Sequence, residues 1–192
     1  DLGKESYEFI DLLNQSDTKI WQVLPWGITD TIEFSPYSSK SSILWNPYIV
    51  SLDNLENQIY NNSELNEIKL PITTEVNYKA VYTNKDKIFN LISERVNYND
   101  NEYQKFLKND LIKRHITFIT LSEVFESSWI EWSSDYQNFS EELFDMVFDE
   151  YKDIFMKNLF LQFEFNKQWQ KLKSYANNNN VSILGDIPIY VN

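Results

Sequence analysis

Residues 181–191 read Val-Ser-Ile-Leu-Gly-Asp-Ile-Pro-Ile-Tyr-Val, an apolar and β-branched run that predicts a buried strand. A long helical pattern over residues 155–176 precedes this run, and the asparagines at 177–180 form the expected turn. Earlier in the chain, residues 19–24 and 47–51 predict two further short buried strands. Because helices and buried strands alternate, the pattern predicts an α/β fold with a parallel sheet of about three strands, covered on both faces.

The third predicted strand has no helix after it. A parallel sheet needs helices on both faces, so we expect these three strands to be the beginning of a larger α/β domain. A first helix is expected over residues 4–16, a long polar loop over 28–44, and a helix through Leu55 and Ile59 with Ser51 or Asp53 as its N-cap.

The middle of the sequence is helical in pattern. Apolar residues recur every three or four positions over residues 76–177, with polar breaks near 97–103 and 127–140. Ser140 precedes two glutamates, which is typical of a helix N-cap followed by acidic residues in the first turn. The sequence therefore predicts a large helical segment between the second and third strands.

The composition excludes several classes of function. The 192 residues carry 17 Lys and Arg against 29 Asp and Glu, a net charge of −12, which argues against a nucleic-acid partner. Without cysteine there is no disulfide, thiolate metal site or cysteine nucleophile, and the single histidine, His115, cannot form a two-histidine metal site. Three glycines cannot supply a glycine-rich nucleotide loop. The chemistry that remains is that of carboxylates, hydroxyls and aromatic rings, and we expect neither metal nor cofactor.

No apolar run approaches the roughly 18–20 residues that cross a bilayer, and the amphipathic first residues do not predict a secretory signal. We therefore expect a protein without a membrane partner. The absence of cysteine fits a reducing compartment, so the expected location is the cytoplasm.

Three segments together resemble one family of enzymes. The first is Asp1–Leu13 with Trp21-Gln-Val-Leu-Pro25, and the second is Ser35-Pro-Tyr-Ser-Ser39 with Asn46-Pro-Tyr-Ile49. The third begins at Gln162-Phe-Glu-Phe165 and Gln168-Trp169 and ends at Gly185-Asp-Ile-Pro-Ile-Tyr-Val191. In their order and spacing they are similar to the amylomaltases, the 4-alpha-glucanotransferases of glycoside hydrolase family 77.

This resemblance implies the N-terminal part of a (β/α)8 TIM barrel with a large helical insertion. It divides the chain into barrel strands and substrate loop (1–52), a mainly helical insertion (53–140), and a long helix with the third strand (141–192), all parts of one truncated catalytic domain. It also implies transfer of alpha-1,4-glucan segments between maltooligosaccharides by a retaining mechanism, without cofactor. A whole barrel needs about 250 residues. The family's catalytic acids lie on later strands, so no catalytic residue is assigned here and the chain alone is expected to be inactive.

Four residues are candidates for substrate binding. Tyr37 matches the family's Ser-Pro-Tyr tyrosine beside the sugar, and a phenol ring suits a sugar's apolar face and hydroxyl rim. Asp186 lies in an apolar strand, where a carboxylate is costly unless it serves a site at the strand's end. Ser35 and Asn46 belong to the same motifs, although turn formation and capping would also explain them.

Two alternatives remain open from the sequence. The chain could be a non-catalytic glucan-binding module or pseudoenzyme, or a helical module that binds a protein through residues 76–177. The loop at residues 28–34 also departs from the family pattern, because it lacks glycine and the usual tyrosine; either Phe34 replaces that tyrosine or nothing does. The sequence does not predict an oligomeric state.

Overall fold

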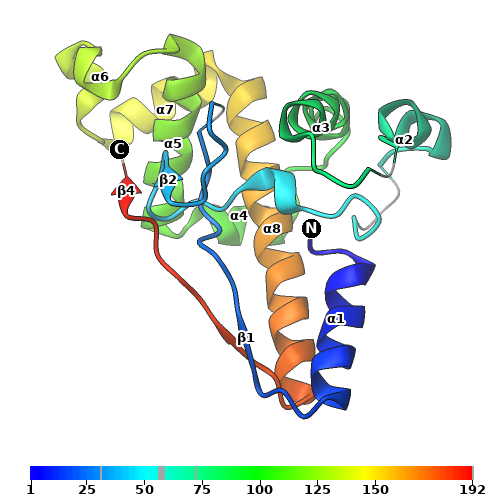
Figure 1. Cartoon of the computed structure of the whole chain (residues 1–192). Coiled ribbons are helices and arrows are strands. Elements are labelled where there is room, and N and C mark those ends of the chain that lie inside the picture. Colours follow the sequence, from blue (N-terminus) through cyan, green and yellow to red (C-terminus); the bar gives the residue numbers. More distant parts are fainter. Residues whose placement is uncertain (31, 56–58, 72, 192) are drawn as a thin grey trace.

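The computed structural model describes residues 1–30, 32–55, 59–71 and 73–191. Its longest element is helix α8 (Lys152–Asn178), drawn in orange in Figure 1. The other elements, in chain order, are α1 (Lys4–Gln15), β1 (Ile20–Gln22), β2 (Ser38–Ser39), the 3-10 helix η1 (Pro47–Ile49), α2 (Asn62–Ile68), α3 (Tyr78–Ser93), α4 (Asn101–Leu107), α5 (Asp110–Phe125), the 3-10 helix η2 (Trp129–Glu131), α6 (Ser134–Gln137), α7 (Glu141–Glu150), β3 (Ser182–Leu184) and β4 (Tyr190–Val191). None of the helices within these described ranges is long and apolar enough to cross a membrane.

Helix α8 forms the centre of the molecule. It contacts α1, α3, α4, α5, α7, η1 and β3. Phe155, Leu159, Phe165 and Leu172 recur at helical spacing along it and are almost completely buried. Helices α1, α3, α4, α5 and α7 therefore pack around α8, with α1 beside its C-terminal half in Figure 1.

The strands pair in parallel, as predicted, but as two separate pairs. β1 lies beside β3 with Ile20 opposite Ser182, and β2 lies beside β4 with Ser38 opposite Tyr190. α8 lies after β1 in the chain and leads directly into β3. This is the order of a unit made of a strand, a helix and a parallel strand. The carboxyl ends of β1 and β3 consequently point the same way.

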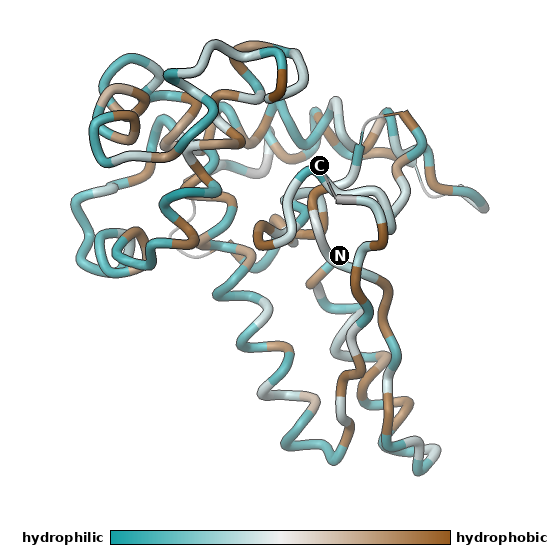
Figure 2. The backbone as a smooth tube through the Cα atoms, turned by 90° about the vertical axis from the view of Figure 1, so that its left-hand side faces the viewer, coloured by the Kyte–Doolittle hydropathy of each residue, from teal (hydrophilic) through white to brown (hydrophobic). Residues whose placement is uncertain are grey.

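The prediction that these strands are buried is wrong for this chain. Ile20, Leu24 and Ile187 are 58%, 56% and 75% exposed. Figure 2 shows hydrophobic stretches along these strand segments at the edge of the molecule. The run 181–191 also splits into β3 and β4, because Pro188 between them has no N–H to donate to a ladder.

The strand predicted at 47–51 is wrong as well, because η1 forms there. Pro47 occupies its first turn, where a missing N–H costs nothing, and the Asn46 side chain accepts a hydrogen bond from the Tyr48 N–H at 3.0 Å. Among the described residues, the strands form two parallel pairs, and there is no three-stranded sheet.

The helical predictions are confirmed for the most part. α1 fills residues 4–15, helices α3 to α8 follow within 76–178, and the Ser140 side chain caps α7 by accepting from the Leu143 N–H at 3.1 Å. The helix expected through Leu55 and Ile59 spans residues 56–58, which lie outside the described residues. The described helix of this region, α2, begins after Asn61 with a capping box to Glu64.

Two buried glutamines of α8 make the backbone hydrogen bonds to the segment 45–51 that a neighbouring strand would otherwise make. Gln162 accepts from the Trp45 N–H at 2.9 Å and donates to the Trp45 carbonyl at 2.8 Å. Gln168 makes the same pair of bonds to Ser51, both at 2.9 Å. Both glutamines are at most 3% exposed. Each amide therefore satisfies one backbone N–H and one carbonyl, buried at Ser51 and partly buried at Trp45, as a β partner would.

The long predicted loop folds back on itself. Gly27 bridges to Trp45 and Thr29 to Ser39, and the Asn46 N–H donates to the Trp26 carbonyl at 2.7 Å. At Gly27 a Cβ would meet the Ser39 hydroxyl at 2.5 Å, so only glycine allows this close approach. Residues 26–30 and 32–46 thus belong to a structured excursion whose two ends are tied together.

The glutamine bonds predict a measurable stability effect. Gln168→Leu leaves the buried N–H and carbonyl of Ser51 without partners, and we expect it to lower the free energy of unfolding by about 2–5 kcal/mol. The control Gln170→Leu changes an exposed glutamine of the same helix, so a change below about 0.5 kcal/mol is expected. Urea denaturation measures both. Equal stability of the two variants would show that the Gln168 bonds are unimportant.

Candidate functional site

Tyr37 and Asp186, two predicted site residues, lie 149 positions apart in sequence and meet in space. The Tyr37 hydroxyl donates a hydrogen bond to Asp186 Oδ2 at 2.9 Å, and the Ile187 N–H donates to Asp186 Oδ1 at 2.8 Å. Asp186 is exposed, and Tyr37 is half-buried. The structure therefore forms one solvent-accessible phenol–carboxylate pair from the two motifs.

Backbone pairing brings the two motifs together. The Tyr37 carbonyl accepts from the N–H groups of Ile189 and Tyr190, at 3.2 and 3.0 Å, and the β2–β4 ladder continues from this point. Asp186 follows β3 by two residues, so it lies beyond the carboxyl end of that strand. In parallel α/β folds this is the end at which ligands bind.

The Tyr37 hydroxyl is protonated at neutral pH. The hydrogen bond to Asp186, together with its charge, raises the pKa of Tyr37 above its ordinary value of 10.0. Tyr37 therefore keeps its proton and donates it to the carboxylate. The remaining lone pairs of the phenol and of Asp186 are free to accept hydrogen bonds from hydroxyl groups of a ligand.

A cavity of about 310 Å³ lies beside Asp186. Four aromatic residues line it: Trp26 and Trp45 from the folded-back segment, and Phe165 and Trp169 from α8. Trp45 stacks on Phe165 with ring centroids 5.2 Å apart, and Trp26 packs on Trp169 at 4.7 Å. The phenol–carboxylate pair thus borders an aromatic wall.

Ser35 and Asn46 lie in supporting positions. The Ser35 hydroxyl accepts from the Tyr37 N–H at 3.3 Å within the turn before β2. Asn46 is 8% exposed, caps η1, and donates from Nδ2 to the Tyr82 hydroxyl at 3.3 Å. The structure therefore brings Ser35 next to Tyr37, whereas Asn46 is used in holding the loop to α3.

The divergent loop packs against α3. Phe34 has a left-handed backbone with φ of 55° and lies on the rings of Tyr78 and Tyr82, with centroids 5.6 and 5.0 Å away. The Thr29 hydroxyl and the Tyr82 hydroxyl are 2.5 Å apart. Phe34 is therefore engaged with α3, one residue before the Ser-Pro-Tyr motif.

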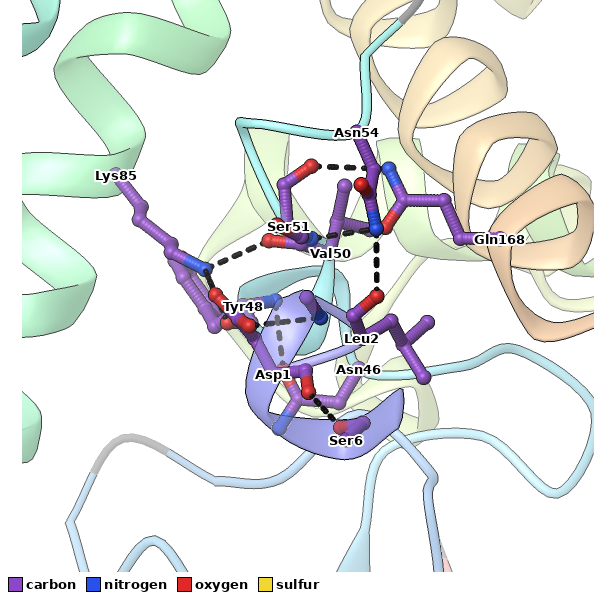
Figure 3. A network of polar contacts seen from close by, with 11 residues as sticks. Asp1, Leu2, Ser6, Asn46, Tyr48, Val50, Ser51, Asn54, Lys85 and Gln168 are labelled. Atoms are coloured by element: carbon purple, nitrogen blue, oxygen red, sulfur yellow. Dashed lines mark hydrogen bonds and ion pairs between the residues drawn. The ribbon is translucent and has the colours of Figure 1, made fainter. Parts of the chain in front are cut away.

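A buried lysine fixes the segment that follows the loop (Figure 3). The Lys85 ammonium donates to the carbonyls of Tyr48 and Val50, both at 2.7 Å, and lies 3.7 Å from an Asp1 carboxylate oxygen. Burial lowers the pKa of Lys85 to about 8, so the group is charged at neutral pH. No sequence pattern indicates this role, because Lys85 resembles any other polar residue of a helix.

The site suits binding more than bond cleavage. Retaining glycoside chemistry uses two carboxyl groups about 5–5.5 Å apart, and the Tyr37 pair contains one carboxylate. Nowhere in the described part of the chain do three His, Cys, Asp or Glu residues gather in a way that could hold a metal ion. The arrangement can position a hydroxyl-rich ligand by hydrogen bonds and ring contacts.

Known proteins resemble this chain over its whole length. The family model described as 4-alpha-glucanotransferase, glycoside hydrolase family 77, matches residues 1–192. The chain belongs to this family. A 4-alpha-glucanotransferase of Clostridium butyricum is 34% identical over 195 residues, and one of Aquifex aeolicus is 32% identical over 200 residues. These alignments include 98% and 99% of this chain but 40% and 39% of the relatives, so the chain spans about 40% of their length.

Two solved amylomaltase structures have this fold over nearly the whole of this chain. Amylomaltase from Streptococcus agalactiae, in complex with acarbose, superposes with a TM-score of 0.84 at 26% identity, over 99% of this chain and 40% of that one. Amylomaltase from Corynebacterium glutamicum gives a TM-score of 0.72 at 13% identity, over 97% and 27% of the two chains, which supports the fold alone. A potato relative is named chloroplastic/amyloplastic, so a cytoplasmic location stays a prediction.

Lys85 predicts a pH dependence of stability. Its pKa is lower in the folded protein than in the unfolded chain, so between about pH 8 and pH 10 the unfolded state binds more protons and folding becomes more favourable as pH rises. Lys85→Met removes this contribution. We expect the free energy of unfolding of the wild type, relative to Lys85→Met, to increase across this interval in urea titrations.

The exposed Lys87 provides the control, because Lys87→Met should keep the wild-type dependence on pH. A wild-type protein whose stability runs parallel to that of Lys85→Met from pH 8 to pH 10 would contradict a lowered pKa at Lys85.

Proposed function

We propose that the whole protein containing this chain is a 4-alpha-glucanotransferase that transfers segments of alpha-1,4-glucan between maltooligosaccharide acceptors by a retaining mechanism. Membership of the family supports the activity. The observation that carries the proposal is the contact between Tyr37 and Asp186, because it joins two motifs of the family in one exposed pair that can bind hydroxyls. The chain itself would supply part of the substrate site.

We also propose that β1 and β3 are neighbouring strands of a (β/α)8 barrel, with α8 as the helix between them. Their parallel pairing, with α8 leading directly into β3 and packing on it, matches the strand, helix and parallel strand unit that such barrels repeat. The exposed apolar residues Ile20, Leu24 and Leu184 are then barrel residues that further strands cover. On this view residues 53–140 form a mainly helical insertion between 1–52 and 141–192.

The proposed chemistry divides the work between this chain and the rest of the enzyme. In a retaining mechanism one carboxylate attacks the anomeric carbon while a carboxylic acid protonates the leaving oxygen. The acceptor hydroxyl then gives its proton to that second group and displaces the nucleophilic carboxylate from the anomeric carbon. We place those two groups outside this chain. Tyr37 and Asp186 accept hydrogen bonds from sugar hydroxyls, and the Tyr37 ring contacts the sugar at the cleavage point.

Holding the sugar in a fixed orientation lowers the barrier, because the reacting atoms then meet without further loss of freedom. A wall of rings beside the pair also excludes water, which favours transfer to a sugar over hydrolysis. The aromatic cavity beside Asp186 meets this requirement in part, through Trp45 and Trp169.

Removing the Tyr37 hydroxyl tests the proposal. In the whole protein, Tyr37→Phe should lower kcat/KM for disproportionation of maltotriose roughly tenfold, and Tyr37→Ala up to about a hundredfold, since each 1.4 kcal/mol corresponds to a factor of ten. The melting temperature should hardly change, because the bond to Asp186 is exposed. Initial rates of glucose release measure the transfer.

Tyr175 offers a matched control, because its hydroxyl donates to Asp11 at 2.6 Å and lies near the end of α8 that precedes β3. Tyr175→Phe removes the same kind of bond away from Asp186 and should leave kcat/KM unchanged. Similar kinetics for Tyr37→Phe, Tyr37→Ala and the control would refute a binding role for Tyr37.

A further inference from the structure

A second cavity, of about 300 Å³, lies between residues 40–42 and the region of α5, η2 and α6. Four aromatic residues line it: Phe118, Trp129, Trp132 and Tyr136. Trp129 is 40% exposed, so its ring is available to a ligand. The cavity shares Ser41 and Ser42 with the cavity beside Asp186 but does not include Asp186 itself.

The charge of this cavity is opposite to that of the protein. Its lining contains Lys40 and Arg114 and no acidic residue, although the chain carries 29 Asp and Glu against 17 Lys and Arg. The only other arginine, Arg95, forms two bonds to the Glu64 carboxylate at 3.0 and 2.7 Å. Within the described ranges the structure records no ion pair of Arg114 or Lys40 with a carboxylate.

The Arg114 guanidinium is held in position by a ring. It lies 4.9 Å from the centroid of Phe139, a cation–π contact, and among the described residues the structure records no hydrogen bond from its N–H donors. Arginine with free donors in a planar arrangement is suited to bind two oxygens of a phosphate group at once.

His115 adds an uncharged donor to the same wall. Ser41 Oγ accepts from the N–H groups of Ile43 and Leu44, at 3.2 and 3.1 Å, and lies 2.8 Å from His115 Nδ1. With both lone pairs of Ser41 used, its own hydrogen goes to His115 Nδ1, which leaves the ring hydrogen on Nε2. Burial also lowers the pKa of His115 and keeps the ring neutral. His115 Nε2–H is therefore a donor of a residue that lines the cavity.

We propose that this cavity binds a phosphorylated monosaccharide, with its phosphate on Arg114 and Lys40 and its sugar ring on Trp129. The anionic group follows from two cations and a neutral donor with no acidic residue among them. The volume is at the lower end of the range for small-molecule sites, about 300–1,000 Å³, which fits one sugar ring. Aromatic rings stack on the apolar face of a sugar, and the choice of a sugar body rests on the function proposed above.

A ligand bound at this site would contact the loop that carries Tyr37. Lys40 follows Tyr37 by three residues, and Lys40 N–H donates to the Ile28 carbonyl at 2.9 Å within the folded-back loop. A phosphate bound to Lys40 therefore contacts the same loop that carries Tyr37.

Calorimetric titration of the whole protein with glucose 1-phosphate tests the proposal. Arg114→Gln should weaken binding about ten- to a hundredfold, the usual effect of losing charge-assisted hydrogen bonds. The matched control Arg95→Gln should bind as the wild type does. Trp129→Ala should weaken glucose 1-phosphate binding but not that of inorganic phosphate, and glucose alone should produce no heat at this site.

Two outcomes would overturn the proposal: no binding of glucose 1-phosphate, or equal affinities in Arg114→Gln and Arg95→Gln. Inorganic phosphate that binds as tightly as glucose 1-phosphate would overturn the sugar part. The maltotriose activity of Arg114→Gln should stay at the wild-type level, because Arg114 is outside the Tyr37 pair. The Tyr37 test measures kcat/KM on maltotriose, and this test measures the binding of glucose 1-phosphate. Failure of one proposal can therefore be distinguished from failure of the other.

Discussion

The rest of the structure depends on the bonds between two glutamine side chains of α8 and the backbone of residues 45–51. Each amide pairs with the N–H and carbonyl of one residue, Gln162 with Trp45 and Gln168 with Ser51, and each partner is 117 positions away in sequence. A buried backbone group without a partner costs about as much as a lost hydrogen bond. The glutamines therefore allow an irregular segment to lie against the central helix without joining a sheet.

The candidate site follows from this placement. With residues 45–51 fixed on α8 and on Lys85, the excursion over residues 26–46 has one anchored end, and the bridges of Gly27 and Thr29 close it. The loop then presents Tyr37 to the segment after β3, where backbone bonds and the Asp186 carboxylate receive it. Buried contacts at some distance thus determine the position of the exposed phenol–carboxylate pair.

Much of the fold could be predicted from sequence, and the exceptions have physical reasons. Helical periodicity predicted α1 and α8, and the cap at Ser140 was readable because capping is local. The run at 47–51 looked like a strand, but a proline start and two distant glutamines favour η1. The apolar side chains of Ile20 and Ile187 predict that both residues are buried, but both are exposed. An apolar side chain indicates that burial would be favourable, and it does not indicate whether another part of this chain covers it. The pairing of Tyr37 with Asp186 depends on long-range topology, and only the family resemblance pointed to both; Lys85 and His115 gave no such signal.

A crystal structure of the whole protein with acarbose would test the central claim, that the Tyr37–Asp186 pair is a sugar-binding element. Acarbose is the ligand in the structure of the Streptococcus agalactiae amylomaltase. If the pair binds sugar, a ligand hydroxyl should lie within hydrogen-bond distance, about 2.6–3.2 Å, of the Tyr37 hydroxyl or an Asp186 oxygen. Acarbose bound in the active site with both residues contacting only protein and water would contradict it.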